Sequence, residues 1–129
     1  MNNALDDARR LMRRAQADLN ALRNMGDREK FDENIYGFHA QQAVEKSLKA
    51  WLAFLGRSYP FRHDLGELLA ALAAAGEDVE NLWTLADLTP FAVQLRYETV
   101  EADTFLDREH VAAEIAALIL RIEEVIKQG

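Results

Sequence analysis

The sequence predicts an all-α protein, a five-helix antiparallel up-and-down bundle whose third helix is short. Alanine, leucine and glutamate, which favour helices, are abundant, whereas proline and glycine occur only two and six times. Apolar residues also recur three and four positions apart in two long stretches, the spacing of one face of an α-helix. The 129 residues, half of them hydrophobic, suit a single domain over residues 1–129 with its own core.

The first helix is expected over about the first 22 residues. Its apolar stripe consists of Leu5, Ala8, Met12, Ala15, Leu19 and Leu22. Gly26 is suited to end this helix, and Asp27 to cap the start of the next. The second helix is predicted from about Arg28 to Leu55, ending at Gly56, although Gly37 within it is a poor helix former.

The second helix has two contrasting sides. Its apolar side consists of Tyr36, Phe38, Val44, Leu48, Trp51, Phe54 and Leu55. A helix covered so widely is expected at the centre of the bundle. The opposite side, here called the polar line, consists of His39, Gln42, Lys46 and Lys49. The polar line binds a ligand, fixes the register of the bundle, or faces solvent, and Glu45 with Lys49 forms an ordinary i,i+4 pair.

A loop and a short helix come next. Gly56 and Pro60 punctuate the segment GRSYPFRHDL, which reads as the loop. Asp64 followed by Glu67 resembles a capping box, so the third helix is predicted to begin there. It is expected to end at Gly76.

Two further helices complete the predicted bundle. The fourth is expected from about Val79 to Tyr97, with a kink or restart at Pro90 because proline cannot continue a helix without disturbing it. Asp107 is the expected cap of the fifth helix. The apolar stripe of that helix consists of Val111, Ile115, Leu118, Ile122 and Val125.

Charge is distributed unevenly along the chain. The net charge is −7 at pH 7, which argues against broad binding to DNA. Residues 1–23 nevertheless carry about +2, because five arginines outnumber three aspartates there. The arginines are Arg9, Arg10, Arg13, Arg14 and Arg23. This local basic patch is compatible with a small phosphate ligand or a short RNA, but such a patch is more often an ordinary solvated face.

Several locations and chemistries are disfavoured. No apolar run approaches the roughly 20 residues of a membrane span, and the opening MNNALDDARR is unlike a secretory signal. The lack of cysteine excludes disulfides and thiolate chemistry and fits a cytoplasmic protein. The histidines His39, His63 and His110 do not pair at helical spacing, so neither a metal nor another cofactor is expected.

What remains is acid–base and phosphate chemistry by histidine, arginine and lysine. Ser47 and Ser58 lack the strand–turn–helix elbow of a nucleophilic serine. A metal-independent site that cleaves RNA needs a base for the 2′-hydroxyl proton, a role that suits histidine, and a guanidinium that holds the phosphate. The candidates for these roles are His39, His63, Arg57, Arg62 and Arg96.

Three segments together resemble the HEPN family of small helical domains. They are FHAQQAVEKSLKAWL at 38–52, FRHDLGELL at 61–69 and LTPFAVQLRYE at 88–98. The likeness extends from about Asp7 to Ile126, and the combination is more specific than any one segment. The resemblance implies an up-and-down helical bundle with a short extra helix, and usually a homodimer.

The same resemblance implies association with a nucleotide or RNA. HEPN relatives are often encoded beside a minimal nucleotidyltransferase, as a toxin–antitoxin-like pair. Some members are metal-independent ribonucleases that carry an arginine and, a few residues later, a histidine near the start of a late helix. Here Arg96 is followed by YETVEAD, which contains no histidine, whereas Arg57 and His63 have the spacing but precede the short third helix. The chain is more similar to the branch with HDL and RY signatures, for which nucleotide binding is inferred.

The leading hypothesis is a nucleotide- or RNA-binding HEPN-like subunit that acts with a nucleotidyltransferase partner. Its expected binding residues are His39, Gln42, Lys46, His63, Arg96 and Tyr97. Glutamine offers paired donor and acceptor groups for a base edge, and lysine a point charge for a phosphate. The alternative is a metal-independent endoribonuclease with Arg57 and His63 as catalytic residues. A second alternative is a non-catalytic scaffold or antitoxin-like dimer.

Overall fold

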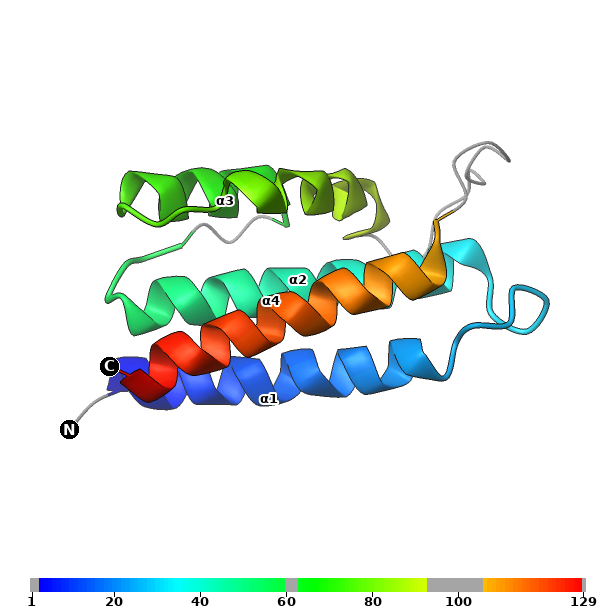
Figure 1. The fold of residues 1–129 in the computed structure, drawn as a ribbon, viewed down its shortest axis with the longest axis horizontal. Coiled ribbons are helices and arrows are strands. Elements are labelled where there is room, and N and C mark those ends of the chain that lie inside the picture. Colours follow the sequence, from blue (N-terminus) through cyan, green and yellow to red (C-terminus); the bar gives the residue numbers. More distant parts are fainter. Residues whose placement is uncertain (1–2, 60–62, 93–105, 129) are drawn as a thin grey trace.

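The computed structural model describes residues 3–59, 63–92 and 106–128 (Figure 1). These residues form the α-helices α1 (Asn3–Arg23), α2 (Glu33–Phe54), α3 (Leu65–Ala74) and α4 (Arg108–Gln128), and the 3₁₀ helix η1 (Glu80–Ala92). The described residues include no strand. The predicted all-α fold of five helices with a short third helix is therefore confirmed.

Helix α2 lies at the centre of the bundle, as its broad apolar side predicts. It packs against each of the other four helices, while α1 also contacts α4 and α3 contacts η1. Leu48, Trp51 and Leu52 of α2 are fully or almost fully buried. In Figure 1, α1 lies on one side of α2, whereas α3 and η1 lie on the other.

Of the three long helices, α1 runs antiparallel to both α2 and α4, which point in the same direction (Figure 1). Helix α2 returns along α1, and α4 runs opposite to α1, so the start of α1 and the end of α4 meet at one end of the bundle. The apolar stripes predicted for these two helices face the core. The buried members are Ala8, Met12, Ala15, Leu19, Leu22, Val111, Ile115, Leu118 and Ile122.

The predicted start of α2 near Arg28 is wrong by about one turn of helix. Asp27 caps an isolated turn at residues 28–30 instead of the start of α2. Its carboxylate accepts a hydrogen bond from the Glu29 N–H at 2.9 Å. The cause lies in α4, because the Arg108 guanidinium donates to the carbonyls of Met25 and Phe31, at 2.7 Å each. These bonds hold the connection in a non-helical course until α2 begins.

Arg108 anchors a buried polar cluster at this end of the bundle. Its guanidinium lies 3.0 Å from the Glu33 carboxylate, and both side chains are buried. The Tyr36 hydroxyl donates to the Arg108 carbonyl at 2.8 Å, and the guanidinium lies over the Tyr36 ring. Burial raises the pKa of Tyr36 to about 12, although the nearby Arg108 charge opposes this. The cluster fixes the start of α4 against the start of α2.

The fourth helix is a 3₁₀ helix in its described part, whereas the sequence predicts an α-helix. Its described part is the 3₁₀ helix η1, which continues through Pro90 without a restart. The reason is visible in the spacing, because apolar residues occur at every third position, and a 3₁₀ helix has three residues per turn. The buried members of this row are Val79, Leu82, Leu85, Leu88 and Phe91. Residues 93–97, which the prediction included, lie outside the described part.

Gly37 is explained by the packing of η1 on α2. A Cβ atom at Gly37 would lie 2.2 Å from Cδ1 of the Phe91 ring, so only glycine lets this buried ring approach α2. The residue that weakened the helix prediction is therefore a docking point.

The predicted ends of α2 and α3 are confirmed, whereas α1 ends at Arg23, three residues before the predicted Gly26. Gly56 and Gly76 have φ angles of 73° and 93° and end α2 and α3. The Asp64 carboxylate caps α3 by accepting from the Gly66 N–H at 2.9 Å. Asp107 caps α4 by accepting from the His110 N–H at 3.2 Å.

Candidate functional site

The polar line of α2 is not a free solvent face. His39, Gln42, Lys46 and Lys49 are all half-buried, and each contacts another polar side chain. The contacts divide into two clusters, each centred on a carboxylate. The first, the Asp18 cluster, joins α1 to α2, and the second, the Glu45 cluster, joins α2 to the residues before α3.

The Asp18 cluster consists of Asp18, His39 and Lys46. His39 Nδ1 lies 3.1 Å from Asp18 Oδ1, and Lys46 Nζ lies 2.7 Å from Asp18 Oδ2. Each carboxylate oxygen therefore meets one partner from α2. These contacts indicate that this half of the polar line fixes the register of α1 against α2, one of the three roles considered for it. A ligand that used His39 and Lys46 would have to share them with Asp18.

The Glu45 cluster is a connected hydrogen-bond network. The buried Glu45 carboxylate accepts from Gln41 Nε2 at 2.7 Å and from Lys49 Nζ at 2.9 Å, and it lies 2.9 Å from His63 Nδ1. Gln41 also donates to the His63 carbonyl at 3.2 Å, and Gln42 donates to Gln41 Oε1 at 2.8 Å. The network thus holds His63, together with its backbone, against α2.

Glu45 is a carboxylate at neutral pH despite its burial. Burial alone would raise its pKa, but hydrogen bonds from Lys49, Gln41 and His63, and the charge of Lys49, lower it below the ordinary value. A buried carboxylate that is paired and hydrogen-bonded in this way avoids most of the cost of burying a charge.

His63 is the exposed member of this network. Its side chain is 58% exposed, whereas that of Glu45 is 6% exposed. Because Nδ1 faces the carboxylate, the neutral imidazole carries its proton on Nδ1 and leaves Nε2 as an acceptor. No described residue bonds to Nε2. A histidine oriented in this way can accept a proton from a bound hydroxyl, or bind a phosphate when protonated.

The other predicted site residues are only partly placed. Arg57 is exposed just beyond α2; its backbone N–H donates to the Leu52 carbonyl at 2.9 Å, but no hydrogen bond joins its side chain to His63. Arg62, Arg96 and Tyr97 lie outside the described residues. Among the described residues, the structure thus brings His63 to the polar line but does not pair it with Arg57.

Sequence reasoning missed Asp18 and Gln41, and treated Glu45 only as the partner of Lys49. A signal for Gln41 and Glu45 was present, because they share the helical face of Leu48, on the apolar side of α2. Polar side chains on such a face require buried partners. Asp18 gave a weaker signal, since it borders the apolar stripe of α1 beside Leu19.

Two further properties concern the described residues as a whole. None of their helices is long and apolar enough to cross a membrane. Within the same residues, no group of three or more histidine, aspartate or glutamate side chains is arranged to hold a metal ion.

The family model of the HEPN domain matches residues 8–128. This match covers nearly the whole chain, so the protein belongs to the HEPN family, as the resemblance of its three segments predicts. No curated protein and no solved structure matches the chain. Membership of this family supports, in general terms, a function connected with nucleotides or RNA.

Proposed function

We propose that this HEPN protein is a nucleotide- or RNA-binding subunit whose ligand contacts the Glu45 cluster through His63. The observation that carries the proposal is the exposed His63 ring held 2.9 Å from the buried Glu45 carboxylate. A side chain that is already oriented loses little conformational entropy when a ligand arrives. The neighbouring Lys49, 2.9 Å from the same carboxylate, adds positive charge to this surface.

The remaining predicted binding residues have different roles in this proposal. Gln42, which is hydrogen-bonded to Gln41, supplies donor and acceptor groups for a base edge. His39 and Lys46 contribute to ligand binding only when the Asp18 cluster opens. Arg96 and Tyr97 are proposed to complete the phosphate site, from the segment that carries the family likeness.

The proposed partner is a minimal nucleotidyltransferase, with which this chain forms a toxin–antitoxin-like pair in the cytoplasm. The proposal also includes a homodimer of the chain. Both rest on the membership of the HEPN family rather than on a contact. Co-expression with an adjacent nucleotidyltransferase, followed by size-exclusion chromatography with light scattering, tests both. Separate elution of the two proteins argues against the pair, and a monomer at micromolar concentration argues against the dimer.

A thermal-shift assay tests the binding function directly. A panel of ribonucleotides and a short single-stranded RNA should include a ligand that raises the Tm, because a ligand that binds only the folded state stabilises it. His63→Ala should abolish the rise. His110→Ala is the matched control, since His110 is also exposed and paired with a glutamate, Glu114, but lies on α4. The absence of any shift across the panel contradicts the proposal.

The second candidate function is a metal-independent endoribonuclease, and the free Nε2 of His63 favours it. In this reaction His63 takes the 2′-hydroxyl proton, the 2′-oxygen attacks the adjacent phosphorus, and the 5′-oxygen leaves as it gains a proton. The products are a 2′,3′-cyclic phosphate and a 5′-hydroxyl. Arg57 is the proposed phosphate-binding group. The enzyme should therefore cleave RNA in EDTA, and His63→Ala and Arg57→Ala should each abolish cleavage.

A non-catalytic scaffold or antitoxin-like dimer is the outcome that remains if both tests fail. The Asp18 cluster suits this role, since its contacts join α1 to α2. In that case Lys46→Ala and His63→Ala should change the stability of the folded protein and nothing else.

A further inference from the structure

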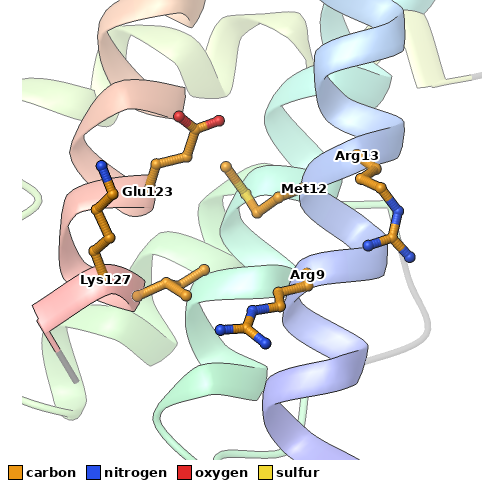
Figure 2. Close-up of a pocket in the computed structure, with 6 residues that line it drawn as sticks. Arg9, Met12, Arg13, Glu123 and Lys127 are labelled. Atoms are coloured by element: carbon orange, nitrogen blue, oxygen red, sulfur yellow. The ribbon is translucent and has the colours of Figure 1, made fainter.

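A groove of about 340 Å³ lies between the first half of α1 and the last turns of α4 (Figure 2). Its lining residues are Arg9, Met12, Arg13, Glu123, Ile126 and Lys127. None of them belongs to the Asp18 or Glu45 cluster. Figure 2 shows Arg9 and Met12 directed from α1 toward α4. The groove thus combines two apolar side chains with three cations and one carboxylate, a local charge of +2.

The positive charges of this groove are not matched within the described fold. Arg9 and Arg13 form no hydrogen bond or ion pair with any described residue, although the chain has 22 acidic residues against 15 basic ones. By contrast, Arg10 on the same helix pairs with Asp7. Arg9 and Arg13 are also one turn apart, a like-charge spacing that slightly destabilises a helix. Helix stability therefore gives no reason for this arrangement.

The C-terminal side of the groove shows the same lack of pairing. Glu123 and Lys127 stand in the i,i+4 order that favours an ion pair, yet no ion pair joins them among the described contacts. The charge of Lys127 therefore remains available to a ligand. The net charge of −7 does not cancel this local field, because charges more than about 8 Å away are largely screened at physiological ionic strength.

We propose that this α1–α4 groove binds the backbone of single-stranded RNA. The inference rests on the proposed function, which it deepens by adding a second contact surface for the same class of ligand. Arg9, directed toward α4, would hold one phosphate, and Arg13, whose guanidinium lies on the side of α1 away from α4 (Figure 2), the next phosphate along the strand, because the guanidinium group matches the geometry of phosphate oxygens. Lys127 adds a point charge from the opposite side of the groove.

The rest of the lining favours RNA over an acidic peptide. Ile126, which is half-buried, offers an apolar surface for an unstacked base or a ribose face, which single strands expose, and the buried Met12 forms the floor behind it. The Glu123 carboxylate can accept a hydrogen bond from the amino group of a base. It would repel the side chains of an acidic peptide, because ionised carboxylates only accept hydrogen bonds and offer no donor to Glu123.

Fluorescence anisotropy with a labelled single-stranded RNA of about ten nucleotides tests the inference over a range of salt concentrations. The test variant is Arg9→Ala/Arg13→Ala. The matched control is Arg10→Ala/Arg14→Ala, which removes the same charge from the same helix but leaves the groove lining intact. All four arginines are exposed, so both proteins should fold, as circular dichroism will verify.

The expected effect follows from counterion release. For single strands, the slope of log K against log salt is about −0.7 per phosphate contact, so losing two contacts should reduce the slope by about 1.4. That change corresponds to about a tenfold loss of affinity at 0.15 M salt. The control should lose no more than about twofold, since distant surface charges are screened. Glu123→Gln should bind about two- to threefold more tightly, because the amide oxygen can still accept from the amino group of a base while the charge that repels the RNA phosphates is removed.

Each contrary outcome is informative. Equal losses in the two arginine variants overturn the groove but leave RNA binding intact, because diffuse charge would then explain it. RNA binding that only His63→Ala weakens also overturns the groove. If Arg9→Ala/Arg13→Ala converts a dimer to a monomer without changing RNA affinity, the groove is an interface between copies of the chain. A wild-type protein that binds nucleotides but no RNA refutes the groove and preserves the nucleotide form of the proposed function.

Discussion

Replacement of Glu45 by glutamine tests the network that positions His63. The change preserves the shape of the side chain but removes its negative charge and places a donor group where the carboxylate had only acceptors. Three donors converge on the carboxylate, from Gln41, Lys49 and His63. A glutamine oxygen can accept from one or two of them, so at least one donor or the new amide group loses its partner.

The magnitude follows from the burial of these groups. An unsatisfied buried polar group costs about 1–3 kcal/mol. Lys49 limits the loss, because its Nζ also lies 5.4 Å from the centre of the Tyr59 ring and retains that cation–π contact. We therefore expect Glu45→Gln to lower the free energy of unfolding at pH 7 by about 1–3 kcal/mol in urea denaturation. Glu124→Gln, an exposed site on α4, should change it by less than about 0.5 kcal/mol.

The pH dependence distinguishes this charge effect from a simple packing defect. In the folded state the hydrogen bonds and the Lys49 charge lower the pKa of Glu45 below 4.5, its ordinary value, although burial opposes them. The resulting stabilisation is fully present above the unfolded pKa and is lost as the pH falls through the folded one. The stability difference between the wild type and Glu45→Gln should therefore narrow below pH 4.5. A difference that stays constant or widens in acid refutes the reasoning, as does equal stability at pH 7.

Three further changes test other parts of the structure, each by urea denaturation. Gly37→Ala should lower the free energy of unfolding by about 1–3 kcal/mol, because its Cβ would lie 2.2 Å from the Phe91 ring. The loss should be smaller when Phe91 is also replaced by leucine. A Gly37→Ala protein more stable than the wild type would contradict the docking of η1. Arg108→Ala should cost about 3 kcal/mol, because Glu33 loses its closer guanidinium and keeps only Arg28, 3.6 Å away, and the Leu106 N–H as partners; an effect below about 1 kcal/mol would show that the cluster is not needed. Asp18→Asn should lower the free energy of unfolding, because His39 and Lys46 lose their charged partner. The released side chains should also increase the affinity for nucleotide, measured by thermal shift, and an unchanged affinity would assign this cluster to the fold alone.

Much of the fold could be predicted because its signals are local. The apolar stripes of α1 and α4, the glycines that end α2 and α3, and the aspartate caps of α3 and α4 depend on residues within a few positions of each other. The start of α2 is not local. Arg108, more than 70 residues away from Phe31 along the chain, bonds the carbonyls that hold the preceding connection out of a helix.

The helix type of η1 had a signal that was easily misread. Spacings of three also occur in the stripe of an α-helix, where they alternate with spacings of four. From Val79 to Phe91 every spacing is three, which keeps one face buried only when the helix turns every three residues. The unbroken run, rather than any single interval, was the informative feature.

The two carboxylates divide the polar line into halves with different chemical prospects. Asp18 places one oxygen against each of its partners, so binding a phosphate to His39 or Lys46 requires breaking a contact between α1 and α2. Glu45 also has all its partners within the fold, but one of them, His63, extends from the buried carboxylate to the surface. A ligand can reach Nε2 of His63 without disturbing any described hydrogen bond. The Glu45 carboxylate, on the opposite side of the ring, orients the imidazole and stabilises its protonated form. Recognition should therefore begin at His63, and the Asp18 half should respond only to ligands whose binding energy exceeds the cost of opening α1 from α2.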